Sequence, residues 1–402
     1  MSGDDTELLY RDDAYLLEFD ARVVERREHR GRPAVVLDRT AFYAESGGQP
    51  WDTGTLDGVR VLEVQHDGGR VVHVVDALPA GETVHGVVDA VRRRDHLQQH
   101  HGQHLLSRAF VDTAGAATAS FHLGEGLCSI DLDRAVTDTQ VRAAEARANA
   151  VVAEARPVSI TSVDRAAALA AGVRVPDEAG DRVRLVDAAG FDRQACSGTH
   201  PRSTSEVGVV LVLGTERYKG GTRVRFVCGD RAQAAVHARV AVLDGLSQAL
   251  SVAWTDLPDA VARVLDERAT LAKRTEELRE RALAGEAAEL LASHTEVPAV
   301  VVAVFDGRDA GELRGLAEQI TAARPAVALL ATRGAKVQLV FARSRDLPVD
   351  LSASLKATLA PAGGRGGGRP ELAQGGCERL DDLEETLRRL ASEIRAAVLP
   401  IT

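Results

Sequence analysis

The chain has 402 residues, of which 45% are hydrophobic and 27% are charged, a balance typical of a folded globular protein with two to four domains. Its net charge of −10 argues against a basic surface overall, and no run approaches the ~18 apolar residues of a membrane-spanning helix. Four cysteines are too few for a disulfide framework, and the acidic N-terminal stretch is unlike a signal peptide. We therefore expect a cytoplasmic protein with reduced cysteines.

Residues 1–90 are expected to form a β-rich N-terminal domain. Short runs such as ARVVERRE, PAVVLDRT and RVVHVVDA alternate apolar and polar residues, and Gly, Pro and Asp separate them. This pattern predicts a small antiparallel domain resembling a barrel. The glycine motif at 46–50 predicts a turn, which is either a plain hairpin loop or a backbone surface close to a ligand, since glycine lets another chain approach.

Residues 91–230 are expected to form a two-layer α+β domain. A helix is predicted at 91–113 and strands at 118–133, and a second helix at 137–155 opens with Thr or Asp as its N-cap. The segments VSITSVD, VRLVDAAG and EVGVVLVLGTERYKGGTRVRFVCG predict strands up to residue 229, so the helices would cover a mainly antiparallel sheet. The first helix should bury its apolar residues, which are Leu97, Leu105, Leu106 and Phe110.

Residues 231–294 are rich in Ala, Leu, Glu and Arg and predict a helical spacer. Because Arg268 and Thr275 occupy positions that a coiled coil would keep apolar, a helical hairpin is favoured over a long coiled coil. Residues 295–402 alternate strand and helix patterns, which predicts a C-terminal α/β domain. Before its final helix, the glycine-rich run at 363–376 is either a flexible linker or a loop that binds phosphate or an RNA backbone.

Two pairs of metal-binding residue types are each spaced four residues apart, His100 with His104 and Cys196 with His200. Residues four apart lie on one face of a helix, so each pair can direct two donors at one ion. A thiolate with imidazoles suits tetrahedral zinc better than calcium, magnesium or manganese. Spacing alone leaves the register open, because His96 with His100 is an equally good pair.

The residues around the two pairs form the runs QQHHGQHLLS (98–107) and ACSGTHPRSTSEVG (195–208). Further runs along the chain are FYAESGGQPWDTGTL (42–56), SFHLGEGLCSIDLD (120–133), YKGGTRVRF (218–226) and GGRGGGRPELAQGG (363–376). Together, and in their order along the chain, they resemble the editing domain of alanyl-tRNA synthetases and their free-standing relatives, the AlaX proteins. The last run is similar to the glycine-rich C-terminal domain of those synthetases, so the resemblance is to the long form of AlaX.

The resemblance implies a trans-editing hydrolase that deacylates mischarged tRNA(Ala), chiefly Ser-tRNA(Ala) and also Gly-tRNA(Ala), without ATP. It makes His100, His104, Cys196 and His200 the ligands of one Zn²⁺ per chain and leaves His96 out. Because residues 1–90 predict β structure and no ATP-binding class II core, the chain is expected to remove an amino acid and not to attach one.

Further site residues are expected from motif position and local charge. Gln49 and Thr199 are expected to contact substrate. His101 and His122 are expected either as polar helpers near the metal or as structural residues, and His101 stands where the family usually has Thr. RNA binding is expected at basic residues near the second pair and in the glycine-rich run, namely Arg217, Lys219, Arg223, Arg365 and Arg369.

Several alternatives stay open at the level of sequence. Zinc would either activate water or orient the substrate, because four protein ligands would close the coordination sphere. A zinc-stabilised tRNA-binding module without catalysis is therefore the alternative function. A phosphoesterase is disfavoured, because the sequence has no Asp-His-His triplet. A homodimer through the helical spacer or the C-terminal domain is one expected assembly.

Overall fold

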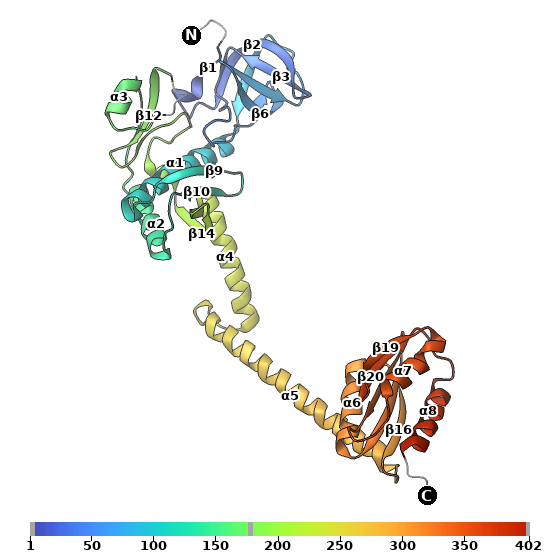
Figure 1. Ribbon diagram of the computed structural model, residues 1–402. Coiled ribbons are helices and arrows are strands. Elements are labelled where there is room, and N and C mark those ends of the chain that lie inside the picture. Colours follow the sequence, from blue (N-terminus) through green and yellow to red (C-terminus); the bar gives the residue numbers. More distant parts are fainter. Residues whose placement is uncertain (1–4, 176–179, 399–402) are drawn as a thin grey trace. The chain divides into compact units, whose positions relative to one another are not determined.

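A computed structural model describes residues 5–175 and 180–398 of the chain (Figure 1). It divides the chain into two compact units, Met1–Ala249 and Leu250–Thr402. The first residues of the acidic N-terminal stretch lie outside the described part. Among the helices that the structure describes, none is both long enough and apolar enough to span a membrane.

The first unit opens with a closed β-barrel, in which the strand order is β2-β3-β7-β6-β5-β8. Alternating apolar residues along each strand face the interior, where Phe19, Val35, Leu56 and Val64 are buried. The barrel strands are β2 (Glu18–His29), β3 (Arg32–Leu37), β5 (Gly54–Leu56), β6 (Val59–Asp67), β7 (Arg70–Val75) and β8 (Thr83–Val88). Before β2, β1 (Glu7–Leu8) pairs with β4 (Arg39–Thr40), and the short helix η1 (Leu9–Arg11) follows β1.

Helix α1 (Ala90–Ala114) follows the barrel directly and confirms the helix predicted at 91–113. The Asp89 carboxylate caps its N-terminus by accepting hydrogen bonds from the backbone N–H groups of Val91 and Arg92. Gly115, with φ +60°, ends it in the left-handed conformation. Helix α2 (Asp138–Ala153) opens with a capping box at Thr137, in agreement with the predicted N-cap.

The single sheet expected for residues 91–230 is wrong, because the strands form two separate sheets. One sheet has the order β14-β15-β10-β9, and the other has the order β11-β12-β13. Helices α1 and α2 pack with the four-stranded sheet around Leu105, Leu106 and Phe110, which are fully buried as expected. The strands are β9 (Thr118–Leu123), β10 (Cys128–Leu132), β11 (Val158–Asp164), β12 (Arg182–Ala188), β13 (Arg193–Ala195), β14 (Val210–Tyr218) and β15 (Gly221–Cys228).

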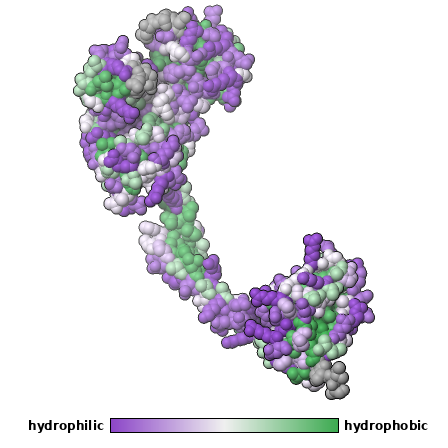
Figure 2. Space-filling model, viewed as in Figure 1, coloured by the Kyte–Doolittle hydropathy of each residue, from purple (hydrophilic) through white to green (hydrophobic). Residues whose placement is uncertain are grey.

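Two short helices complete this part of the first unit, α3 (Arg165–Ala170) and η2 (Thr204–Val207). Two long helices fill the expected spacer, α4 (Gly229–Leu250) and α5 (Leu257–Ala292), with η3 (Trp254–Asp256) between them. Both helices expose apolar side chains, such as Val242 on α4 and Leu271 on α5. Figure 2 shows hydrophobic residues gathered on the surface of α4.

The second unit is a three-layer α/β fold around a five-stranded sheet with the order β16-β17-β18-β20-β19. Helices α7 (Leu351–Leu359) and α8 (Leu383–Val398) pack on one core, and α6 (Ala310–Ala323) with the end of α5 packs on the other. The sheet strands are β16 (Ala299–Asp306), β17 (Ala326–Arg333), β18 (Val337–Arg343), β19 (Arg365–Arg369) and β20 (Leu372–Cys377). The short helix η4 (Ala360–Ala362) precedes β19.

The glycine-rich run at 363–376 forms a β-hairpin, β19–β20, so the expected linker or loop conformation is wrong. Gly366 and Gly375 face each other across this hairpin. A Cβ on Gly375 would lie 2.6 Å from both the Gly366 Cα and a methyl group of Leu359 on α7. The glycines are therefore explained by close packing of α7 on the hairpin, a role that needs no ligand.

Candidate metal centre

Four donor side chains meet in the first unit. Helix α1 supplies His100 and His104, and the loop that follows β13 supplies Cys196 and His200. One potential ligand atom from each of the four lies within 4.8 Å of the others. The structure therefore brings together the set that the resemblance implies, from segments far apart in the sequence.

His100 is oriented by Gln49, from the glycine motif that precedes α1. The Nδ1 atom of His100 lies 2.6 Å from Gln49 Oε1, while its Nε2 atom lies 3.3 Å from the Cys196 sulfur. The same Gln49 oxygen accepts a hydrogen bond from the backbone N–H of Thr199, and Gln49 Nε2 donates to Thr199 Oγ1. Gln49 and Thr199 are 1% and 0% exposed, and these hydrogen bonds hold the ligand loop against α1.

His104 is oriented by Asp192, which immediately precedes β13. Its Nδ1 atom lies 3.0 Å from a carboxylate oxygen of Asp192. Burial lowers the pKa of His104, but the interactions with Asp192 and Cys196 outweigh it and raise the pKa to about 10. A carboxylate that orients a ligand imidazole is a recurring feature of zinc sites, and the sequence motifs gave no sign of this one.

His200 pairs with His101 instead of with an oxygen. The Nδ1 atoms of the two rings lie 3.1 Å apart, and His200 Nε2 lies 3.2 Å from the Cys196 sulfur. Burial lowers the pKa of His200 to about 3, and burial together with the neighbouring imidazoles lowers the pKa of His101 well below its usual value. His101 therefore lies behind the four-donor cluster, in contact with one of its members.

Cys196 lies in a loop held by Arg184 on β12. One guanidinium nitrogen, Nη1, donates to the backbone carbonyls of Cys196 and Gly198, each at 2.9 Å. Burial raises the pKa of the Cys196 thiol, but the imidazoles of His100 and His200 lower it further, to well below its usual value. Gly198 is required here, because a Cβ at this position would overlap the His100 ring. The site therefore favours a thiolate, the form of cysteine that binds metal.

The donor set fits a zinc ion. Ligand atoms of a tetrahedral zinc with one sulfur and three nitrogens lie roughly 3.4–3.6 Å apart. The Cys196 sulfur lies 3.3 and 3.2 Å from the nearest nitrogens of His100 and His200, close to that spacing. All three histidines are buried and Cys196 is half-buried.

The structure places His96 outside this cluster. Its Nδ1 atom faces a carboxylate oxygen of Asp52 at 3.6 Å, in the buried junction between α1 and the barrel. Arg93 donates to the other Asp52 oxygen and to the carbonyls of Ala14 and Ala41. Arg93 and Asp52 are 2% and 0% exposed, so this pair anchors the metal-bearing helix to the barrel. Because Arg93 and Asp52 lie in separate sequence motifs, no local pattern predicted that they would pair.

His122 lies apart from the cluster, exposed on β9. Because side chains alternate along a strand, its neighbour Phe121 faces the site instead, with its ring 6.2 Å from the His100 ring. A Cβ on Gly48 would lie 2.7 Å from the Phe121 ring, which accounts for glycine in that turn. The polar-helper role expected for His122 therefore has no support in this arrangement.

The expected RNA-binding residues differ in their availability. Arg217, Lys219, Arg365 and Arg369 are exposed. Arg223 is already engaged, since it donates two hydrogen bonds to Asp131 and its guanidinium lies 3.7 Å from the centre of the Tyr218 ring. Phosphate contacts would therefore be made by the four exposed residues.

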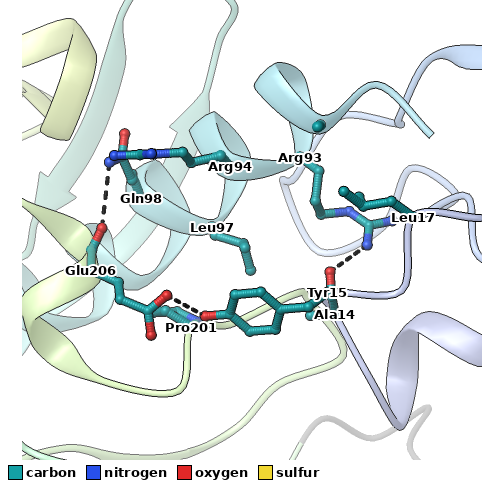
Figure 3. Close-up of a pocket in the computed structure, with 10 residues that line it drawn as sticks. Ala14, Tyr15, Leu17, Arg93, Arg94, Leu97, Gln98, Pro201 and Glu206 are labelled. Atoms are coloured by element: carbon teal, nitrogen blue, oxygen red, sulfur yellow. Dashed lines mark hydrogen bonds between the residues drawn. The ribbon is translucent and has the colours of Figure 1, made fainter.

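A pocket of about 330 Å³ lies beside the N-terminal half of α1 (Figure 3). Leu17, Leu97 and Pro201 give it apolar walls. Its polar groups are paired with one another, because the Tyr15 hydroxyl donates to Glu206 and Gln98 Nε2 donates to the Glu206 carbonyl. The residues around this pocket therefore fasten the segment that follows His200 to α1 and to the chain before the barrel.

Three family models match parts of the chain. Family models match at residues 6–92 (tRNA synthetases class II (A)), residues 183–225 (threonyl and alanyl tRNA synthetase second additional domain) and residues 296–396 (DHHA1 domain). The first match falls on the barrel segment, and the second includes Cys196 and His200.

Full-length relatives are alanine–tRNA ligases. That of Pyrococcus furiosus is 33% identical over 97% of this chain and 44% of its own length, and that of Halorubrum lacusprofundi is 34% identical over 98% and 44%. The chain thus spans less than half the length of these relatives. A solved structure, the C-Ala domain of Aquifex aeolicus alanyl-tRNA synthetase, matches 24% of this chain and 88% of its own at 30% identity, with a TM-score of 0.22. The chain is therefore built from alanyl-tRNA synthetase-related domains and is homologous over nearly its whole length to part of the alanine–tRNA ligases.

Proposed function

We propose that this chain is a zinc-dependent aminoacyl-tRNA hydrolase of the AlaX type, which removes serine, and secondarily glycine, from mischarged tRNA(Ala) in trans. The observation that carries the proposal is the convergence of His100, His104, Cys196 and His200 within 4.8 Å. It occurs in a chain that aligns over nearly its whole length with alanine–tRNA ligases. The reaction consumes water and no ATP, because hydrolysis of an aminoacyl ester is itself favourable.

A zinc ion held by these four residues would supply Lewis acidity or fix the substrate in place. The chain's own residues hold the ligand geometry. Gln49 and Thr199 join α1 to the ligand loop, and Asp192 orients His104. Cys196 is the least buried ligand, so the aminoacyl ester would approach from its side.

Selectivity for serine would come from a polar group that pairs with the serine hydroxyl. When alanine occupies such a pocket, that group loses its partner, and sites of this kind discriminate by ~10⁴-fold or more. An apolar pocket alone could not reject alanine, because it would bind both residues to similar extents.

The exposed basic residues would bind the tRNA body. Arg217 and Lys219 lie at the β14–β15 turn of the first unit, and Arg365 and Arg369 lie on the edge strand β19 of the second. Phosphate contacts need local positive charge and not a positive total, so a net charge of −10 is compatible with RNA binding. Contacts far from the ester would raise affinity and help to position it.

The alternative is a zinc-stabilised tRNA-binding module without catalysis. It is favoured by one observation, that four protein donors lie close enough together to fill a tetrahedral coordination sphere, as they would in a structural zinc site. Hydrolysis would then require a fifth ligand or the release of one of the four.

The test is incubation of the purified chain with Ser-tRNA(Ala), with ester loss followed in the zinc-loaded protein, after chelation and after zinc is restored. We expect hydrolysis that chelation abolishes and zinc restores. Binding of tRNA without ester loss in the loaded protein would contradict catalysis and favour the binding module.

A further inference from the structure

Each ligand imidazole uses its two nitrogens in the same way. In His100, His104 and His200, Nδ1 faces a hydrogen-bond partner behind the site, and the ring's other nitrogen is the one left for the ion. For His100 and His104 the acceptors are oxygens, from the Gln49 amide and the Asp192 carboxylate. An oxygen without a proton can only accept, so it fixes the ligand as the Nδ1–H tautomer with a free Nε2 lone pair.

The acceptor for His200 is different in kind, because it is the imidazole of His101. With 3.1 Å between two Nδ1 atoms, one of them must carry the proton and the other must accept it. If His101 donated, His200 would carry its own proton on Nε2 and could not use that nitrogen as a ligand. If His200 donates, its Nε2 lone pair is free and points towards the Cys196 sulfur, 3.2 Å away.

The geometry points to His101 as the positioning residue of His200: its Nδ1 accepts the Nδ1 proton of His200 and so leaves His200 Nε2 as the metal ligand. The inference rests on the metal site of the proposed function and not on hydrolysis. In this arrangement the remaining proton of His101 lies on Nε2, an atom that is buried without a hydrogen-bond partner among the described residues. Leaving a buried N–H unpaired costs stability. The hydrogen bond that His101 Nδ1 accepts from His200 gives a reason for an imidazole at this buried position.

The role separates His101 from the catalytic groups. It is 1% exposed and lies behind His200, so it touches neither solvent nor an approaching ester. Its effect should be exerted through the metal affinity and through the tautomer of His200. In zinc sites, loss of a hydrogen-bond partner of this kind weakens metal binding by about 10- to 100-fold.

Two variants of similar shape test the inference in the full chain. His101→Asn keeps an acceptor close to the position of Nδ1, whereas His101→Leu has the same branching and no acceptor. Gln103→Leu serves as the control, because it removes a different buried hydrogen bond of α1, from Gln103 to Ser107. Zinc affinity is measured by competition with a chromophoric chelator, and the histidine tautomers are read by ¹H–¹⁵N correlation in ¹⁵N-histidine-labelled, zinc-loaded protein.

We expect His101→Leu to weaken zinc binding about 10- to 100-fold, and His101→Asn and Gln103→Leu to bind zinc nearly as the wild type does. Zinc-loaded wild-type protein should show His200 protonated on Nδ1. Unchanged affinity in His101→Leu, or equal losses in all three variants, would overturn the inference. If His101→Leu does not fold, a zinc-loaded wild type with the His200 proton on Nε2 overturns it alone. A wild type that binds no zinc contradicts the metal site as well, whereas lost hydrolysis with zinc retained contradicts only the proposed activity.

Discussion

The Nδ1 atom of His104 and a carboxylate oxygen of Asp192 lie 3.0 Å apart, although 88 positions separate the two residues in the chain. This contact joins the middle of α1 to the β12–β13 connection, which is followed by β13 and then by the ligand loop. The same carboxylate accepts a hydrogen bond from Gln194 Nε2 through its other oxygen. Asp192 therefore orients a ligand on one segment while it is itself held by the other.

Asp192→Ala should weaken zinc binding about 10- to 100-fold, because His104 loses the acceptor that fixes its ring. The control is Asp187→Ala, which removes a carboxylate that bonds to Gly190 and Arg193 on the same sheet without touching a ligand. Chelator competition measures both affinities. Equal affinities in the two variants would contradict the role of Asp192.

His104→Ala and His96→Ala should differ in whether the protein still binds zinc. His104→Ala removes a ligand and should abolish tight zinc binding. His96→Ala should keep zinc but lower the free energy of unfolding, because the buried ring is removed and leaves a cavity beside Asp52. Elemental analysis and urea unfolding separate the two. Zinc lost from His96→Ala and kept by His104→Ala would show that the other register is right.

Arg93→Met should be strongly destabilising. It leaves the Asp52 carboxylate buried without its cation, and breaking a buried pair in this way costs about 3–5 kcal/mol. The neighbouring Arg94→Met is the control, because that side chain is 68% exposed and lies 3.6 Å from Asp230, a surface pair worth at most about 1 kcal/mol. Urea unfolding of zinc-loaded protein gives both values. Similar losses in the two variants would contradict the anchoring role of the pair.

Acid should destabilise the barrel through His73. Burial lowers the pKa of this fully buried histidine to about 4, so between that value and its ordinary 6.5 the unfolded chain binds the extra proton. The contribution of neutral His73 to the free energy of unfolding is therefore complete above pH 6.5 and is lost as the pH falls towards 4. The loss amounts to about 3 kcal/mol, since one pKa unit is worth 1.36 kcal/mol.

The check on this pH dependence is His73→Met, which cannot titrate. The free energy of unfolding of each protein is measured from pH 7 to pH 4, and the difference between the two curves isolates this residue. The wild type should lose more stability over the range than His73→Met does. Parallel curves would mean that His73 does not titrate as its burial implies.

Neutralising Arg365 and Arg369 together should raise KM for mischarged tRNA and leave kcat nearly unchanged. Each lost phosphate contact should reduce the salt dependence of binding by a slope on the order of one. Arg379→Gln is the control, since this exposed arginine of the same unit is paired with Asp381. The measurement is KM against salt concentration. An unchanged KM and slope in the double variant would assign the glycine-rich hairpin to structure alone.

Local signals in the sequence predicted local structure well. The apolar spacing around Leu105 and Phe110 gave α1 and its buried face, and Thr137 marked the start of α2. The prediction for the glycine-rich run was wrong, because its composition favours a loop whereas the run pairs as two strands beneath α7. Its outcome depends on packing against a helix that is distant in sequence, and such packing overrides local preference.

In the metal centre, too, local patterns predicted some residues, whereas others depend on how distant segments pack. The family motifs found the four donors. The helical i, i+4 argument holds for His100 and His104 on α1 but is wrong for Cys196 and His200, which lie in the loop after β13. Asp192, Arg184 and the acceptor role of His101 depend on how three segments pack, and no spacing rule connects them. Gln49 and Thr199 were found by motif position, but their burial against each other supports positioning more than substrate contact.

The most direct test of the account compares deacylation of Ser-tRNA(Ala) and Ala-tRNA(Ala) by the zinc-loaded wild type, by Cys196→Ala and by Cys128→Ala, whose buried thiol lies outside the cluster. The wild type and Cys128→Ala should hydrolyse Ser-tRNA(Ala) far faster than Ala-tRNA(Ala), and Cys196→Ala should lose both zinc and hydrolysis. Equal rates on the two tRNAs, or full activity in zinc-free Cys196→Ala, would contradict it.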